Sequence, residues 1–201
     1  MKIAVDIDGV LRDLMGGFWE YYNRENSTDF KSCEQGVYNL GEIIGVSYEE
    51  AGKLLDDYCL SEDFKMVKAI EGSSDAVALL KRYHELFAIT ACPSWMKEDT
   101  EEFLGNNYSG HFSQLIFSGE FYPGQSSKSK DKICGDLEIG VIVEDNAFHS
   151  ECYAGKGLQV LLFNQPWNQK LSHENVIRCY GWGDVVAEIK KYEGSLIQNG
   201  N

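Results

Sequence analysis

The stretch Lys2-Ile3-Ala4-Val5-Asp6-Ile7-Asp8-Gly9-Val10 decides the fold of this chain. A short apolar run that leads directly into acidic and glycine residues is typical of a buried strand and its carboxyl end. Residues two apart on an extended chain point to the same side, roughly 6–7 Å apart. The carboxylates of Asp6 and Asp8 can therefore reach one small site, which Gly9 allows a backbone or a ligand to approach closely.

Beyond residue 72 the chain alternates between strands and helices. The predicted strands cover 86–91, 114–117, 139–143, 159–163 and 175–179, and the predicted helices cover 75–83, 97–104, 146–154 and 182–192. Apolar strands that alternate with helices are typical of a parallel sheet with helices on both faces. The sequence therefore predicts an α/β fold.

A longer helical stretch interrupts this alternation before Gly72. Apolar and aromatic residues recur at helical spacing from Asp13 to Glu25, and Ser47 with Glu50 forms the capping box of a helix that runs to about Tyr58. We therefore predict a small helical cap over residues 15–70, inserted into a core made of residues 1–14 and 71–201.

The composition limits the classes of partner. The 201 residues suit one domain, or one domain with a modest insertion. With 32 acidic and 18 basic residues, the formal net charge is −14. This charge argues against binding a nucleic-acid polymer or an anionic membrane surface. A phosphorylated substrate would meet a repulsive field, so the site needs a local cation, for which a metal is the obvious candidate.

The six cysteines are spread along the chain without a CxxC spacing, as expected for buried thiols in a reducing compartment. The apolar runs, such as Gln159-Val160-Leu161-Leu162-Phe163, are too short to cross a bilayer. No basic and apolar leader precedes the strand-like run at Lys2. We therefore expect a cytoplasmic location.

Reactive residue types follow several predicted strands. Ligands of open parallel sheets bind at the carboxyl ends of the strands, where Asp6 and Asp8, Thr90, and the pair Glu144-Asp145 are placed. A threonine hydroxyl and neighbouring backbone N–H groups can hold phosphate oxygens, and acids directly after an apolar strand suit a hard metal. Thr90 alone is a weak signal, and Asp145 could instead begin a helix.

A lysine between these strands could balance the charge of a phosphate group. Lys128, Lys130 and Lys132 all lie in the segment before the strand at 139–143. We favour Lys132 because it adjoins the apolar Ile133 at the start of ordered structure. The alternative is that all three lysines are solvated.

The paired carboxylates predict phosphate chemistry. With a reference pKa of about 3.9, a carboxylate is ionised at neutral pH and is a competent nucleophile. Mg²⁺ would offset its repulsion from a phosphate dianion. A second carboxylate off the metal could protonate the leaving oxygen and later activate water. The alternative is a strand end followed by a turn, with Asp6 and Asp8 merely solvated.

In order and spacing, Asp6-x-Asp8-Gly9-Val10, Thr90, Lys132 and Glu144-Asp145 resemble the four motifs of the haloacid dehalogenase (HAD) superfamily. The paired aspartates point to its phosphatase branch, and the resemblance implies a Rossmann-like core. The stretch from Asp8 to Phe18, DGVLRDLMGGF, is similar to DGVLADFEGGF of the 5'(3')-deoxyribonucleotidase family. The segment 162–168, LFNQPWN, is similar to that family's LF-x-x-P-[WY]-N.

The resemblance implies a role for each matching residue. Asp6 would be the nucleophile, and Asp8 the general acid/base that also lends its backbone carbonyl to Mg²⁺. Asp145 would be the third protein ligand of the metal, with Glu144 in support. Phosphate would be held by Thr90, Ala91 and Lys132.

The implied substrate is a nucleoside monophosphate. Leu14 replaces an aromatic residue of the family and Arg12 a small one, so the substrate preference is open. Residues proposed to contact substrate are Arg12, Phe18, Tyr22, Phe64 and Trp95, with core packing as the alternative for the aromatic ones. Two other functions stay open: a phosphatase of another small metabolite, and a non-catalytic phosphate- or metal-binding module on the same fold.

Overall fold

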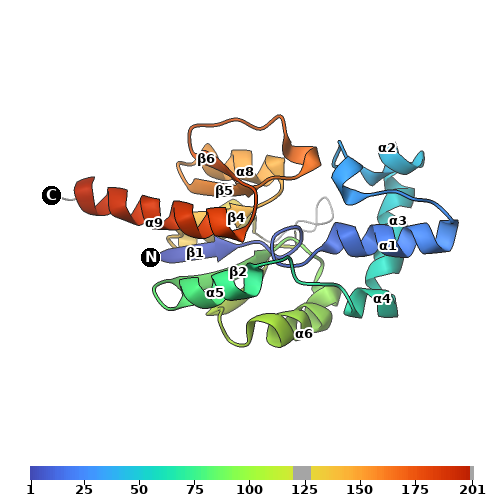
Figure 1. Ribbon diagram of the computed structural model, residues 1–201, viewed down its shortest axis with the longest axis horizontal. Helices are drawn as coiled ribbons and strands as arrows, with labels where there is room; N and C mark the ends of the chain where they lie inside the picture. The colour runs from blue at the N-terminus through green and yellow to red at the C-terminus, as the bar shows by residue number, and fades with distance from the viewer. Residues whose placement is uncertain (120–127, 200–201) are drawn as a thin grey trace.

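The computed structural model describes residues 1–119 and 128–199 (Figure 1). Its strands are β1 (Lys2–Val5), β2 (Glu85–Thr90), β3 (Gln114–Phe117), β4 (Val141–Glu144), β5 (Gln159–Phe163) and β6 (Val176–Cys179). Its α-helices are α1 (Leu14–Asn26), α2 (Leu40–Ile44), α3 (Tyr48–Cys59), α4 (Glu62–Lys65), α5 (Ser73–Lys81), α6 (Lys97–Tyr108), α7 (Lys130–Asp136), α8 (Ala147–Ala154) and α9 (Trp182–Asn199). Three short 3₁₀ helices, η1 (Ser32–Glu34), η2 (Ser94–Met96) and η3 (Pro166–Asn168), lie in the connections.

The six strands form one parallel sheet in the order β3-β2-β1-β4-β5-β6. Ile3 pairs with Leu86 of β2 and with Val141 of β4, so β1 lies at the centre of the sheet. The predicted α/β fold is confirmed. A central β1 matters for the site because the carboxyl ends of β2 and β4 flank its own.

Two apolar clusters cover the two faces of the sheet. On one face α5, α6 and α9 pack against the strands through residues such as Val77, Phe103 and Val185. On the other face α7 and α8 pack through Ile133 and Tyr153. Side chains alternate along each strand, so neighbouring residues of β1 enter different clusters: Ile3 and Val5 the first, Ala4 the second.

The helices α1 to α4 gather beyond the carboxyl ends of the strands (Figure 1). They have their own apolar cluster, which contains Phe18, Trp19 and Tyr58 and reaches the sheet unit through Cys92 and Met96. The capping box predicted at Ser47 is present at the start of α3. We refer to residues 15–70 as the helical unit.

Two chain segments join the helical unit to the sheet. They run side by side, with the Asp13 amide donating to the Lys68 carbonyl at 3.0 Å and the Ile70 amide to the Leu11 carbonyl at 2.8 Å. Both segments leave the sheet beside the end of β1. This arrangement holds the helical unit close to Asp6 and Asp8.

The sequence did not predict every helix. Residues 26–45 show no clear period, yet η1 and α2 form there, and α7 forms in the lysine-rich segment before β4. Short helices contain too few turns to show an apolar period, and they depend on tertiary packing for stability. Within residues 1–119 and 128–199, no helix is both long and apolar enough to span a bilayer.

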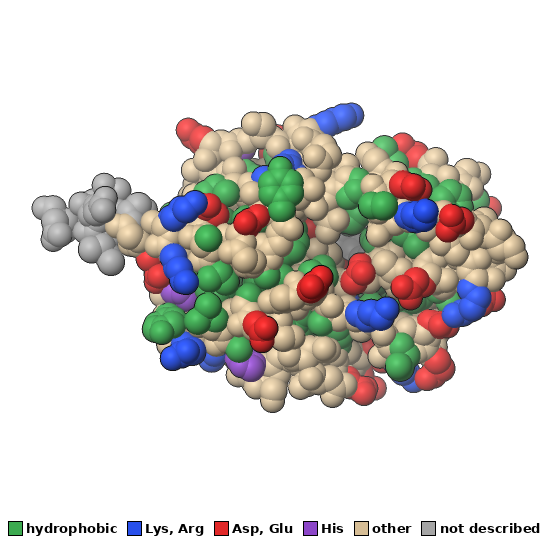
Figure 2. Space-filling model, viewed as in Figure 1, with side chains coloured by type: hydrophobic (Ala, Val, Ile, Leu, Met, Phe, Trp, Pro, Cys, Tyr) green, Lys and Arg blue, Asp and Glu red, His purple; other side chains and the backbone are tan. Residues whose placement is uncertain are grey.

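Acidic and basic side chains intermingle over the face shown in Figure 2. Lys and Arg do not form a continuous stripe among the described residues on this face. A stripe of that kind is what a nucleic-acid backbone requires.

Candidate active site

The carboxyl end of β1 places Asp6 in a buried position, with 6% of the residue exposed. The Asp6 amide continues the sheet by donating to the Val143 carbonyl at 2.9 Å. One carboxylate oxygen, Oδ1, accepts a hydrogen bond from the Ile7 amide at 2.8 Å. The backbone on both sides of Asp6 thus fixes where this carboxylate points.

Three carboxylates meet at this point. Asp6, Glu144 and Asp145 each offer an oxygen, and these oxygens lie within 4.8 Å of one another. All three residues are buried, with Glu144 fully so. Burial, followed by the charge of Glu144, raises the pKa of Asp6 to about 7 and raises the pKa of Asp145. Crowded, buried carboxylate oxygens are the donor set of a hard divalent cation, which would relieve this repulsion.

Lys130 supplies a positive charge to the same cluster. Its Nζ lies 2.8 Å from Oδ1 of Asp6 and 3.2 Å from Oε2 of Glu144, and the side chain is 2% exposed. Burial alone would lower the pKa of Lys130, but the charges of Asp6 and Glu144 outweigh that effect and raise it. Lys130 is therefore a buried ammonium beside the proposed nucleophile.

The preference for Lys132 is corrected by this geometry. Lys132 is exposed on α7, and Lys128 forms an ion pair with Asp136. Lys130 begins α7, so Ile133 and Cys134 follow at positions i+3 and i+4 and share its buried face. That helical spacing is the signal in the sequence that would have identified Lys130.

Thr90 ends β2, next to β1, and is 1% exposed. Its hydroxyl accepts a hydrogen bond from the Cys92 amide at 3.1 Å, which shapes the turn that contains Ala91. Burial raises the pKa of the Cys92 thiol to about 11. Cys92 is therefore a neutral thiol and not an activated nucleophile.

Asp8 and Arg12 form a bidentate ion pair. Arg12 Nε donates to Asp8 Oδ1 at 2.7 Å, and Arg12 Nη2 donates to Oδ2 at 3.1 Å. The Asp8 side chain keeps 21% of its surface exposed, whereas that of Arg12 has none. Asp8 is thus partly open to the site, while Arg12 lies behind it.

The proposed substrate contacts divide into two groups. Arg12, Phe18 and Phe64 are buried and offer a bound substrate no surface. Phe18 instead packs against Trp19 and Tyr58, with ring centroids 5.0 and 6.0 Å away. The three assignments are corrected to packing roles, whereas Trp95 is 42% exposed and Tyr22 is partly buried.

Tyr38, which the sequence did not single out, extends from the helical unit toward the acidic cluster. Its side chain is 64% exposed, but surrounding protein desolvates the hydroxyl. This desolvation and the charge of Asp145 raise the pKa of Tyr38. The segment before it, η1, contacts η3 of the sheet unit. Tyr38 therefore lies at the mouth of the site.

The LFNQPWN segment supports Asp145 from behind. Asn168 Nδ2 donates to the Asp145 carbonyl at 2.8 Å and to the Phe163 carbonyl at 2.7 Å. Asn168 is 1% exposed, so it fixes the end of β4 relative to β5. In this way it positions the backbone that carries Asp145.

Only glycine fits at position 9, because the Asp145 side chain lies directly against it. Its φ of +81° suits glycine, and a Cβ built there would lie 2.3 Å from Oδ2 of Asp145. Any larger residue would displace the Asp145 carboxylate from the cluster. The glycine that follows Asp8 thus allows β1 and β4 to bring their acids together.

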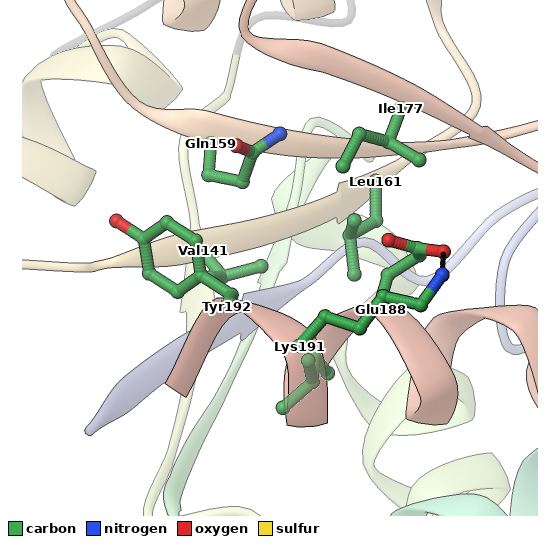
Figure 3. A pocket seen from close by; sticks show the side chains of 8 residues that line it. Val141, Gln159, Leu161, Ile177, Glu188, Lys191 and Tyr192 are labelled. Carbon is green, nitrogen blue, oxygen red and sulfur yellow. Dashed lines mark hydrogen bonds and ion pairs between the residues drawn. The ribbon is translucent and has the colours of Figure 1, made fainter. Parts of the chain in front are cut away.

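A cavity of about 260 Å³ lies elsewhere, between α9 and strands β4 to β6 (Figure 3). Val141 and Gln159, which line it, are the first residues of β4 and β5. The cavity therefore lies toward the amino ends of the strands, whereas the acidic cluster lies at their carboxyl ends. Apolar side chains and a Glu188–Lys191 ion pair of 2.5 Å surround it.

The chain matches known proteins over most of its length. Residues 1–192 match the family model "5' nucleotidase, deoxy (Pyrimidine), cytosolic type C protein". The 5'(3')-deoxyribonucleotidase of Bacillus subtilis is 22% identical, covering 93% of this chain and 97% of the relative.

Two solved structures share the fold. A haloacid dehalogenase-like hydrolase from Streptococcus pneumoniae has a TM-score of 0.66 and 15% identity, covering 94% of this chain and 97% of the other. A HAD-hydrolase from Bacillus subtilis, bound to magnesium, has a TM-score of 0.58 and 13% identity over 92% and 96%. The chain therefore has the fold of haloacid dehalogenase-like hydrolases. It belongs to the cytosolic type C 5' nucleotidase family, and it is a phosphoric monoester hydrolase.

Proposed function

We propose that this protein is a Mg²⁺-dependent 5'-nucleotidase that hydrolyses (deoxy)nucleoside monophosphates through an aspartyl-phosphate at Asp6. The observation that carries the proposal is the ion pair between Asp6 and Lys130 beside the carboxylates of Glu144 and Asp145. A nucleophilic carboxylate must approach a phosphate dianion, and this cluster is built to balance such charge.

In the first step a carboxylate oxygen of Asp6 attacks phosphorus. The ester P–O bond breaks, its electron pair passes to the leaving oxygen, and Asp8 donates a proton to that oxygen. Lys130 balances negative charge on the phosphoryl oxygens, with Thr90 and the backbone at Ala91 as further donors. Asp6 is then joined to the phosphoryl group.

In the second step water replaces Asp6. Asp8, now ionised, takes a proton from the water as its oxygen attacks phosphorus. The bond between Asp6 and phosphorus breaks, which returns the carboxylate and releases inorganic phosphate. A Mg²⁺ held by Asp6, Asp145 and the Asp8 backbone carbonyl, with Glu144 beside it, would supply Lewis-acid assistance and offset the repulsion between carboxylate and phosphate.

The helical unit over residues 15–70 is proposed to be the cap that covers the substrate. Trp95 and Tyr38 are exposed aromatic side chains, and they could stack on a base. The deoxyribonucleotidase relative supports a nucleotide substrate. The six free cysteines support a reducing, cytoplasmic location.

A substrate panel tests this function. Mg²⁺-dependent phosphate release is measured from purine and pyrimidine ribo- and deoxyribonucleotides and from sugar phosphates, with wild type and with Asp6→Asn. We expect nucleotides to have the highest kcat/KM and Asp6→Asn to be inactive. Preference for sugar phosphates would indicate a phosphatase of other metabolites, and equal activity of both proteins would refute Asp6 as the nucleophile.

A further inference from the structure

The ion pair between Asp8 and Arg12 joins Asp8, the proposed general acid and base, to a buried and closely packed side chain. Arg12 is fully buried, and its guanidinium carbon lies 4.7 Å from the ring centroid of Phe64 and 5.4 Å from that of Phe103. Phe64 belongs to α4 of the helical unit and Phe103 to α6 of the sheet unit. The two rings restrict the guanidinium through packing and cation–π attraction.

The backbone of Arg12 is fixed as firmly as its side chain. Its amide donates to the Ile7 carbonyl at 2.8 Å, and its own carbonyl accepts from the Gly9 amide at 2.9 Å. These bonds close the loop that carries Asp8. The donor and the acceptor of the ion pair therefore belong to one rigid turn.

Stability alone does not explain a buried arginine here. A buried ion pair often contributes no more stability than apolar side chains of similar size. Arg12 Nη1 is buried and has no hydrogen-bond partner among the described residues, which adds a further cost of desolvation. An apolar residue would fill the space between Phe64 and Phe103 without that cost.

We propose that Arg12 is a positioning residue that aims the Asp8 carboxylate at the leaving oxygen and at the attacking water. The two hydrogen bonds from Arg12 to Asp8 differ in length, and this difference suits a carboxylate that is held by one oxygen and exchanges a proton through the other. The shorter one, 2.7 Å to Oδ1, anchors the carboxylate, whereas the longer one, 3.1 Å to Oδ2, is the weaker. Oδ2 is thus the oxygen that can release Arg12 and exchange a proton with substrate or water.

The proposal rests on the proposed function, because it assigns Arg12 to the acid/base steps of that reaction. In the first step Oδ2–H gives its proton to the leaving oxygen as the ester bond breaks. In the second step Oδ2 takes a proton from water as the Asp6–phosphoryl bond breaks. Oδ1 stays bound to Arg12 Nε in both steps.

Leaving groups that differ in basicity test this role. The alkoxide leaving group of a nucleotide needs the proton from Asp8, whereas the nitrophenolate of p-nitrophenyl phosphate departs without one. The ratio kcat/KM reports the step in which the leaving group departs. The decrease in kcat/KM of an Arg12 variant should therefore be larger for the nucleotide than for p-nitrophenyl phosphate. A structural role for Arg12 would lower kcat/KM for both esters together.

We compare wild type, Arg12→Lys and Arg12→Met with a matched control, Arg24→Lys. Arg24 forms a similar bidentate pair with Asp63, at 2.7 and 2.8 Å, but on the surface of the helical unit. Arg12→Lys keeps the charge without the two-pronged geometry. Arg12→Met fills the aromatic pocket without a buried charge and serves if the lysine variant does not fold.

We expect kcat/KM for a nucleoside monophosphate to fall about 10- to 100-fold in both Arg12 variants, part of the usual contribution of acid/base catalysis. For p-nitrophenyl phosphate kcat/KM should fall less than about threefold, while kcat falls and phosphorylated protein accumulates because water activation is impaired. Arg24→Lys should match wild type. Added to Asp8→Asn, Arg12→Lys should cause no further loss.

Three results would overturn the positioning role: an equal loss for both esters, no loss for either, or an additive loss in the Asp8→Asn background. Failure of the proposed function looks different. In that case wild type would not hydrolyse the nucleoside monophosphate, or Asp6→Asn would be as active as wild type.

Discussion

Lys130 Nζ lies 2.8 Å from Oδ1 of Asp6. This ion pair joins the first residue of α7 to the aspartate that directly follows β1. The same ammonium contacts Glu144 at 3.2 Å. Lys130 therefore connects the end of β1 with the end of β4.

Replacing this lysine should impair catalysis specifically. Lys130→Met removes a fixed cation aimed at the phosphoryl oxygens, and we expect kcat/KM to fall about 10²- to 10³-fold, as for other lost electrostatic donors. Lys132→Met, on the exposed side of the same helix, should retain wild-type activity. Steady-state kinetics on both variants checks this, and a larger loss in Lys132→Met would contradict the assignment.

The acidic cluster of Asp6, Glu144 and Asp145 predicts that Asp145→Asn raises thermal stability without Mg²⁺ and weakens the stabilisation by Mg²⁺. Asp145→Asn removes one of three crowded carboxylates, so the metal-free protein should unfold at a higher temperature than wild type. Saturating Mg²⁺ should stabilise wild type by about 2.7 kcal/mol at a hundredfold excess over Kd, and should stabilise Asp145→Asn much less. Glu151→Gln, exposed on α8, is the control. Equal Mg²⁺ effects in all three proteins would exclude this cluster as the metal site.

Phe18 should affect stability rather than substrate binding. It is fully buried among the rings of the helical unit, so Phe18→Ala should lower the free energy of unfolding by about 3–5 kcal/mol. Tyr48→Ala, at a side chain that is 65% exposed, should change it little. Denaturant titration measures both. A raised KM at unchanged stability would restore Phe18 as a substrate contact.

His84 predicts a loss of stability in acid. Burial lowers its pKa, and the nearby Glu193 carboxylate, 3.5 Å from Nδ1, only partly opposes this. The unfolded chain, with a histidine pKa of about 6.5, then binds more protons than the folded one, so stability falls as pH drops through that value. His84→Gln should show a shallower decline of the unfolding temperature below about pH 6.5. A decline as steep as that of wild type would contradict this explanation.

The features predicted correctly from the sequence are those that depend on the local pattern of apolar and polar residues. β3 and β5 have the predicted bounds, and the acids after β1 and β4 meet as expected from their places at strand ends. Lys130 was missed because α7 was not recognised, so the helical spacing that selects it from three lysines was not applied. Arg12 was proposed as a substrate contact, and only its packing between Phe64 and Phe103 shows that it is buried. Tyr38 follows a stretch without a period, so its place beside Asp145 depends on how the helical unit packs on the sheet.

The most direct measurement of the central claim is the site of phosphorylation during turnover. Wild type and Asp8→Asn are each mixed with Mg²⁺ and either a nucleoside monophosphate or the activated aryl ester p-nitrophenyl phosphate. The mixtures are quenched in acid within one turnover, digested, and analysed by mass spectrometry. We expect one phosphoryl group on the peptide that contains Asp6, at a higher level in Asp8→Asn with an activated aryl phosphate, because water attack then lacks its base. Phosphate release without any phosphorylated peptide, or a phosphoryl group on another residue, would contradict Asp6 as the nucleophile.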